Sequence, residues 1–162
     1  MQGISKQMRD SSIKKGDQMK RDTLLVTLRI FIGIIFFWFG VLKFFPGLSP
    51  AESLAITTMD WVFQGLIPGN ISIKLLALLE LLIAGGLILG IYVRYILPIF
   101  LFHMSVTFLP LFIFPEITFT HVPYGLTLEG QYIVKNIVFI ALGLFLYVNR
   151  KKIRNKYITD DK

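Results

Sequence analysis

Hydrophobic side chains fill four long segments of the chain, and polar side chains gather between these segments and at the two ends. Residues 24–42 form a run of nineteen positions in which Arg29 is the one ionisable side chain. A helix needs about 20 apolar residues to cross the hydrocarbon core of a bilayer. We therefore expect membrane spans at about 24–44, 73–93, 95–114 and 131–148. The pattern predicts an all-α polytopic membrane protein, an antiparallel four-helix transmembrane bundle over residues 24–148.

One face of the first span carries polar and small side chains. Its residues are three or four positions apart, a spacing that places side chains on one face of a helix: Arg29, Gly33, Phe37, Gly40 and Lys43. An arginine in hydrocarbon costs at least about 2.5 kcal/mol, and glycine gains nothing from lipid contact. This face is predicted to pack against protein. In the second span, Gly86 and Gly90 lie four residues apart, which favours close helix packing.

The connection between the first two spans predicts a short helix. Pro46 and Gly47 should end the first span. The sequence from Ser49 to Glu52, SPAE, has the form of a capping box with proline at the first helical position, and predicts a helix of about 50–65. The segment is too apolar for a free loop and too polar for the hydrocarbon centre. We expect an extracytoplasmic interfacial helix anchored by Trp61. Its alternative role is that of a lid over a pocket.

Charge is distributed unevenly between the two sides of the predicted bundle. Thirteen lysines and arginines lie in the two tails and at position 94, against three at positions 43, 74 and 135, and Arg29 lies within a span. Because basic residues favour the cytoplasmic side, we expect both termini in the cytoplasm and an inner-membrane location. Residues 1–23 are predicted to be a disordered cytoplasmic tail and 149–162 a basic cytoplasmic tail. A removable signal peptide fits poorly, because further spans follow the first.

Composition narrows the chemistry. The chain has 162 residues, of which 54% are hydrophobic and 17% charged, and this leaves room for one membrane domain. The absence of cysteine excludes dithiol exchange and thiolate metal sites. The formal net charge of +7 comes from residues that flank the spans, so we interpret it as contact with membrane lipids and not with nucleic acid. We expect no metal site and no covalently bound cofactor.

Several polar side chains meet at one level of the predicted bundle. Glu80 lies about seven residues into its span, where a carboxylate must be protonated, paired or next to water. We expect it to pair with Lys43 or Lys135. The predicted topology places four polar residues of the spans in the outer half of the bundle: Lys43, Glu80, Lys135 and Asn136. Three residues of the loops lie at the same end: Trp61, His121 and Tyr124.

This set of residues has two interpretations. It is either an ion pair that locks the bundle, or a polar ligand pocket with an aromatic wall. Arg29 lies toward the cytoplasmic end and is expected to snorkel to lipid phosphates. His103, near the middle of the third span, is either a hydrogen-bonded structural residue or a group for proton transfer or ligand contact.

These residues carry a family resemblance. The chain resembles the DoxX superfamily, especially its YkgB-like branch, over roughly residues 24–148. The resemblance rests on Arg29 with Gly33, Gly40 and the pair Lys43-Phe44, on Glu80 followed by small residues, and on EGQYIVKN at 129–136. It implies a four-helix membrane domain related to a thiosulfate:quinone oxidoreductase subunit, with the family's polar positions at Arg29, Lys43, Glu80 and Lys135. Relatives commonly have an acidic residue where this chain has Asn136, which puts any proton chemistry of that acid in doubt here.

Three functions remain open at this stage, and whether the protein is an enzyme is one of the open questions. The first is a redox-associated subunit that binds a quinone or similar lipid-soluble ligand, with electrons from a partner subunit, because the sequence has no recognisable haem, flavin or iron–sulfur site. The second is a non-catalytic scaffold or assembly factor whose buried charges are structural. The third, a small transporter that acts as a homo-oligomer, lacks the internal repeat that many transporters have.

Overall fold

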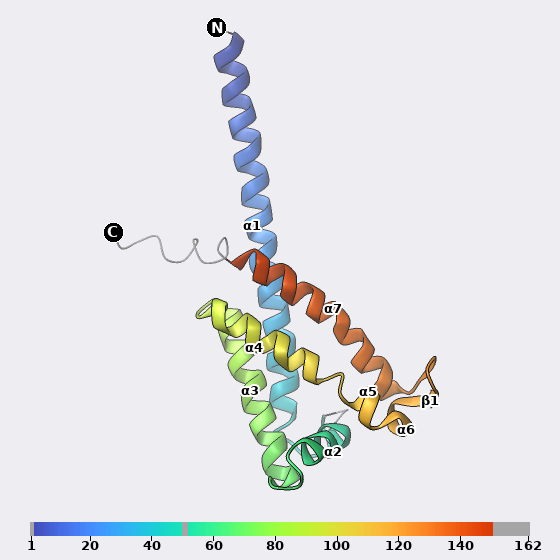
Figure 1. Cartoon of the computed structure of the whole chain (residues 1–162). Coiled ribbons are helices and arrows are strands. Elements are labelled where there is room, and N and C mark those ends of the chain that lie inside the picture. The colour runs from blue at the N-terminus through green and yellow to red at the C-terminus, as the bar shows by residue number, and fades with distance from the viewer. Residues whose placement is uncertain (1, 50–51, 151–162) are drawn as a thin grey trace.

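The computed structural model describes residues 2–49 and 52–150 of the chain. Within these ranges, four helical segments are long and apolar enough to cross a membrane: Ile13–Leu42, Gly69–Leu89, Val93–Ile113 and Leu128–Val148. They lie next to one another and alternate in direction, and two shorter helices and a hairpin lie at the end away from the N-terminus (Figure 1). The predicted all-α polytopic bundle is confirmed.

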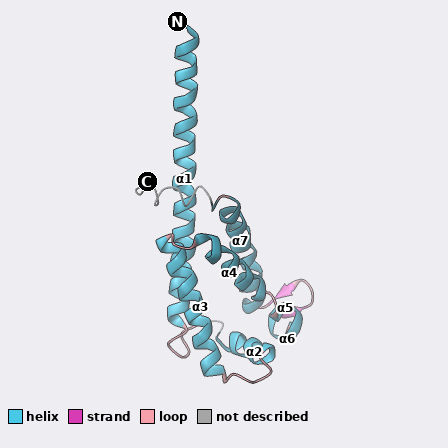
Figure 2. Cartoon of the chain, turned by 60° about the vertical axis from the view of Figure 1, so that its left-hand side comes forward, coloured by secondary structure: helices cyan, strands magenta, loops and turns pink. Residues whose placement is uncertain are grey.

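The first helix, α1 (Gln2–Leu42), begins far ahead of the predicted span. Its N-terminal part projects from the bundle as a continuous helix (Figures 1 and 2). The prediction of a disordered tail over residues 1–23 is therefore wrong for residues 2–23. Lysine, arginine, glutamine and methionine, all good helix formers, are frequent in this segment, and it contains no proline. A helix that the apolar segment already nucleates can propagate outward at little further cost.

The second helix, α2 (Glu52–Val62), lies where a helix of about 50–65 was predicted and packs against α3 (Gly69–Leu89). Its start differs from a regular capping box. The Glu52 carboxylate reaches back to accept a hydrogen bond from the backbone N–H of Gly47, 2.8 Å away, and the Glu52 N–H donates to the Ser49 carbonyl. The location of α2 in a membrane interface stays a prediction.

The second and fourth spans start earlier than predicted. Helix α3 begins at Gly69, directly after Pro68, and ends before Gly90, whose left-handed backbone (φ 73°) lets its N–H cap the Gly86 carbonyl. The predicted range of 73–93 followed the apolar run and missed both signals. Helix α7 (Leu128–Val148) begins three residues before the predicted 131, where the Thr127 hydroxyl accepts a hydrogen bond from the Gly130 N–H. The tail over 149–162 lies outside the described residues from 151 onward.

The third span is interrupted. Helix α4 (Val93–Val106) contains Pro98 and ends before a turn over residues 107–109, after which Pro110 begins α5 (Pro110–Ile113). The expected kinked helix is thus two helices. The following loop contains a short helix, α6 (Pro115–Thr118), and an antiparallel hairpin of β1 (Phe119–His121) and β2 (Gly125–Leu126). Neither the short helix nor the hairpin was predicted from the sequence.

Glycines bring the helices close together. A Cβ atom at Gly33 would lie 2.7 Å from Ile88 Cγ1, and one at Gly143 would lie 2.6 Å from Phe100 Cε1. The helix pairs α1–α3 and α4–α7 therefore pack with little space between their backbones. The buried core between the helices comprises Leu25, Ile32, Phe36, Ile83, Ala84, Leu87, Val93, Leu97, Phe100, Met104 and Leu146.

The outward faces of the bundle are apolar as well. Trp38 is 64% exposed, Leu82 61% and Phe102 72%, each from a different membrane-spanning segment. In water such faces would be unfavourable, whereas in a bilayer they contact lipid tails at no cost. The helices are therefore lipid-contacting.

The close approach of α1 to α3 gives a direct test of the packing. We expect Gly33→Ala to lower the free energy of unfolding by about 1–3 kcal/mol, because its methyl group would overlap Ile88. Gly85→Ala on α3 is the matched control, because a Cβ atom there would have no neighbour within 4 Å. Thermal unfolding in detergent measures both variants. Equal stability of the two would contradict the observed helix contact.

Candidate functional site

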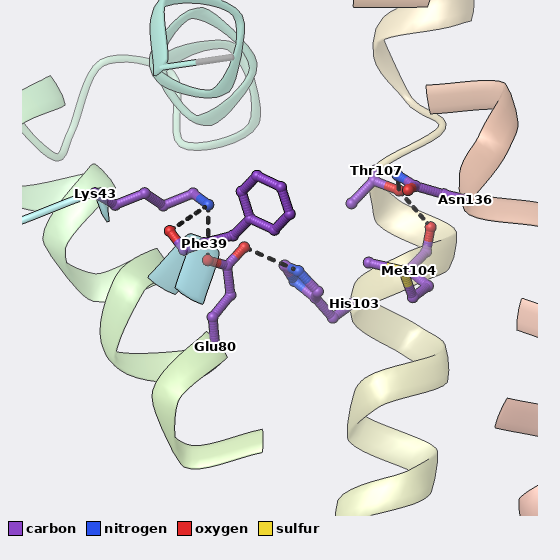
Figure 3. A network of polar contacts seen from close by, with 7 residues as sticks. All are labelled: Phe39, Lys43, Glu80, His103, Met104, Thr107 and Asn136. Carbon is purple, nitrogen blue, oxygen red and sulfur yellow. Dashed lines mark hydrogen bonds and ion pairs between the residues drawn. The ribbon is translucent and has the colours of Figure 1, made fainter. Parts of the chain in front are cut away.

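Three ionisable side chains from three helical segments meet inside the bundle. Lys43 follows the end of α1, Glu80 lies near the middle of α3, and His103 lies near the middle of the Val93–Ile113 segment. Lys43 Nζ donates a hydrogen bond to Glu80 Oε2 at 2.7 Å, and His103 Nε2 lies 3.5 Å from Glu80 Oε1 (Figure 3). We call these residues the Glu80 cluster. The predicted pairing of Glu80 with a lysine is confirmed, and the partner is Lys43.

The cluster is almost closed to the surroundings. The side chains of Lys43 and Glu80 are 11% and 10% exposed, and that of His103 is 7% exposed. Removing two charges from water is costly, and the short contact offsets this cost by making the pair neutral as a whole. Lys43 Nζ also donates to the Phe39 carbonyl at 3.5 Å. The ammonium group has three N–H bonds. Two of them have acceptors within the described ranges, and the third N–H bond is available for a further partner.

His103 is the member of the cluster that sequence reasoning did not connect to Glu80. Its ring meets the edge of Phe36, with centroids 5.7 Å apart and an interplanar angle of 75°. Phe36 in turn packs on Phe100 at 5.0 Å. A usable signal existed in the depth of each residue: in two adjacent antiparallel segments of 21 residues, Glu80 lies one residue from the midpoint and His103 lies at the midpoint. The displaced boundaries of the predicted spans hid this match.

The depth of Glu80 within its span also differs from the prediction. The carboxylate was predicted about seven residues into its span, but it lies eleven residues from Gly69, about 16 Å along the axis at 1.5 Å per residue. The predicted depth was too small because the helix starts at Gly69 and not at 73. Gly40 makes the contact from α1 possible, since a Cβ atom there would lie 3.3 Å from Glu80 Cβ.

A second polar contact lies at the break between α4 and α5. Asn136 of α7 donates from Nδ2 to the hydroxyl oxygen of Thr107 at 3.2 Å, and this hydroxyl donates to the Met104 carbonyl at 2.6 Å (Figure 3). Thr107 follows His103 by one helical turn. Asn136 therefore reaches the same part of the bundle as the Glu80 cluster, as expected, but it contacts Thr107 and supports the turn that ends α4.

Lys135 does not join the cluster. Its side chain is exposed, and Nζ lies 5.5 Å from the centroid of the Tyr132 ring. Consecutive residues on a helix point about 100° apart, so only one of Lys135 and Asn136 can face α4. Of the two lysines predicted as alternative partners of Glu80, Lys135 is therefore the one that the structure does not use.

The three loop residues lie at the end of the bundle formed by α2 and the hairpin (Figure 1). Trp61, in the last turn of α2, is 56% exposed. His121 and Tyr124 stack on one another at the hairpin with centroids 6.3 Å apart, and Tyr124 is 81% exposed. The common end agrees with the predicted arrangement. A ligand-covering role for these exposed rings stays a prediction.

Arg29 occupies a different level of the α1–α3 contact. The side chain is 1% exposed, and its guanidinium lies directly over Gly90 at the end of α3. Gly90 and Glu80 are ten residues apart, about 15 Å along α3, so Arg29 is separate from the cluster as expected. The expected snorkelling to lipid phosphates is wrong, because the guanidinium is buried against backbone. At this place its charge complements the negative C-terminal end of the α3 dipole.

The ion pair can be tested by a double-mutant cycle. We expect Glu80→Gln to cost about 3–5 kcal/mol in the free energy of unfolding, because the Lys43 ammonium then stays buried without its counter-charge. Adding Lys43→Met should recover part of this loss, which thermal unfolding in detergent would show. Lys135→Met is the matched control, and its effect should simply add to that of Glu80→Gln. Additivity in both cycles would refute the contact between Lys43 and Glu80.

Comparison with known proteins assigns neither a family nor a function to the chain. No protein-family model matches the chain, and no curated protein and no solved structure is significantly similar to it. The resemblance to the DoxX superfamily therefore stays a prediction that rests on the motifs quoted above.

Proposed function

We propose that this DoxX-like membrane protein binds the polar head of a quinone, or of a similar lipid-soluble carbonyl compound, at the Glu80 cluster. It would act as a redox-associated subunit, with electrons supplied by a partner protein. The observation that carries the proposal is the sharing of one buried carboxylate by an ammonium and an imidazole group. Intramembrane ionisable groups are costly and commonly mark ligand or proton sites.

The chemistry of the donor set fits a carbonyl head group. A quinone oxygen is a hydrogen-bond acceptor, and the third N–H of Lys43 and the imidazole of His103 are suitable donors. The aromatic ring of Phe36 beside His103 offers an apolar contact for a flat ring system. Ligand sites with mostly apolar walls and a few convergent polar groups have this composition.

A structural role is the second candidate, and one observation favours it. The Lys43–Glu80 contact of 2.7 Å satisfies both charges without any ligand, as a pair that locks α1 to α3 would. In this case the protein is a non-catalytic scaffold or assembly factor. The difference between the two functions lies in what happens when the pair is removed as a unit in a protein that still folds.

We also propose the orientation and the partners. Both termini lie in the cytoplasm and the α2 end lies outside the inner membrane, because twelve basic residues of the tails and Arg94 lie on one side, against three on the other. The α2 helix then lies in the outer interface, anchored by Trp61. The partners are membrane lipids and either a redox subunit or further copies of this chain.

Extraction of lipids from purified protein tests the ligand. We expect mass spectrometry to find a quinone in wild-type protein and a loss of at least tenfold in the double variant Lys43→Met with Glu80→Gln, because the head group then lacks its charged partners. Lys135→Met, which removes an exposed lysine instead, should retain the ligand. Equal quinone content in folded wild type and double variant would favour the structural role.

Labelling of single cysteines tests the orientation. The chain has no native cysteine, so one can be placed in turn at positions 10, 60, 122 and 158. In intact cells an impermeant thiol reagent should label positions 60 and 122 and leave positions 10 and 158 unlabelled until the membrane is opened. The reverse pattern would overturn the proposed orientation.

A further inference from the structure

The two oxygens of the Glu80 carboxylate have different partners. Oε2 accepts the short hydrogen bond of Lys43, and Oε1 faces Nε2 of His103 at 3.5 Å. Lysine carries three N–H donors and no acceptor in its charged form, whereas imidazole both accepts and donates protons. Lys43 therefore holds one side of the carboxylate, and the other side faces a group that exchanges protons.

We propose that His103 and Glu80 form a proton-transfer pair, and that this pair supplies and takes up protons at the head group of the bound ligand. The delivery of protons to a ligand rests on the proposed function, whereas the proton exchange between His103 and Glu80 does not. In the transfer the N–H bond at Nε2 of the imidazolium breaks and an O–H bond forms at Oε1 of Glu80. Lys43 keeps its proton throughout.

The transfer leaves the net charge of the cluster unchanged. With Lys43 and His103 protonated and Glu80 ionised, the cluster carries one positive charge. After the transfer, Lys43 is charged and the other two are neutral, so the net charge is again one. The transfer removes two of the three buried charges, and this offsets part of the cost of leaving the Lys43 ammonium without its counter-charge.

The immediate surroundings of the pair are largely aromatic. Phe36 of α1 contacts the His103 ring, packs on Phe100 of α4 and lies 6.4 Å from Phe139 of α7, measured between ring centroids. The hydroxyl groups nearest to His103 along its segment already have partners, because Ser105 donates to the Leu101 carbonyl and Thr107 to the Met104 carbonyl. Within the described ranges, Glu80 contacts two ionisable groups, Lys43 and His103, and His103 contacts one, Glu80.

Infrared difference spectroscopy of the purified full-length protein tests the pair without any ligand. At one fixed pH we expect a carboxylic-acid C=O band from the protonated form of Glu80. The band should be lost in Glu80→Gln. In His103→Gln the intensity of the band should change at least twofold, because the imidazole that exchanges the proton is gone. Ser105→Ala, an exposed change two residues along α4, should leave it unchanged.

A second measurement covers the case in which a His103 variant fails to fold. The chain has two histidines, so nitrogen NMR of protein labelled in histidine resolves the His103 imidazole once His121→Gln has removed the other signal. We expect Glu80→Gln to change the nitrogen chemical shifts of the His103 imidazole, because Nε2 then no longer faces a carboxylate. Unchanged nitrogen shifts together with no carboxyl band from Glu80 would overturn the proton-transfer pair.

Addition of decylubiquinone separates this inference from the proposed function. If both hold, saturating quinone shifts the carboxyl band, and the shift is absent in His103→Gln. If the carboxyl band depends on His103 as described but quinone neither binds nor shifts the band, the pair stands and the quinone assignment is overturned. If quinone binds saturably with no change in either residue, the ligand-binding function stands and the proton-transfer inference is overturned.

Discussion

The buried ion pair between Lys43 and Glu80 is the interaction on which the arrangement of the first three membrane helices depends. A carboxylate in the middle of an apolar helix is tolerated only when a counter-charge reaches it. The ammonium of Lys43 reaches it at 2.7 Å because α1 passes close to α3 at Gly40, one turn earlier. The requirement to pair one charge thus fixes how far α1 lies along α3 and which face it presents.

A second polar contact reinforces the same register from the other end of the helix pair. The buried guanidinium of Arg29 lies over Gly90, where any side chain would collide with it and where the left-handed backbone also calls for glycine. Between the two polar contacts, Gly33 lets the backbones approach. Because lipid tails are as apolar as the side chains, apolar packing alone would leave the helices freer to slide, and these contacts supply the specificity.

The third segment gives the interior its chemical character. It brings His103 to the free oxygen of Glu80 and then breaks at Thr107, where Asn136 of α7 supports the turn. Non-helical backbone at membrane depth is tolerated where protein surrounds it, and the Asn136 contact provides part of that environment. One level of the bundle therefore carries a charged pair, an imidazole and a hydrogen-bonded helix break.

The sequence by itself determined the four apolar segments, their alternation and the need for a partner for Glu80, because hydrophobic periodicity and the cost of a bare charge act locally. It placed Arg29, Gly33 and Gly40 correctly on the protein-facing side of the first span, but Phe37 is 52% exposed and Phe36 is buried in its place. Only the tertiary structure decided which partner is used. Lys43 and Lys135 are equivalent by charge and predicted depth, but the rotation of α7 about its own axis turns Asn136 inward and Lys135 outward. His103 lies beside Glu80 because the two residues are at the same depth in α3 and α4. This depth depends on the first residues of the two helices, Gly69 and Val93, which the hydrophobic pattern does not mark. Rotation and depth are set by side-chain packing between helices, which no single segment contains.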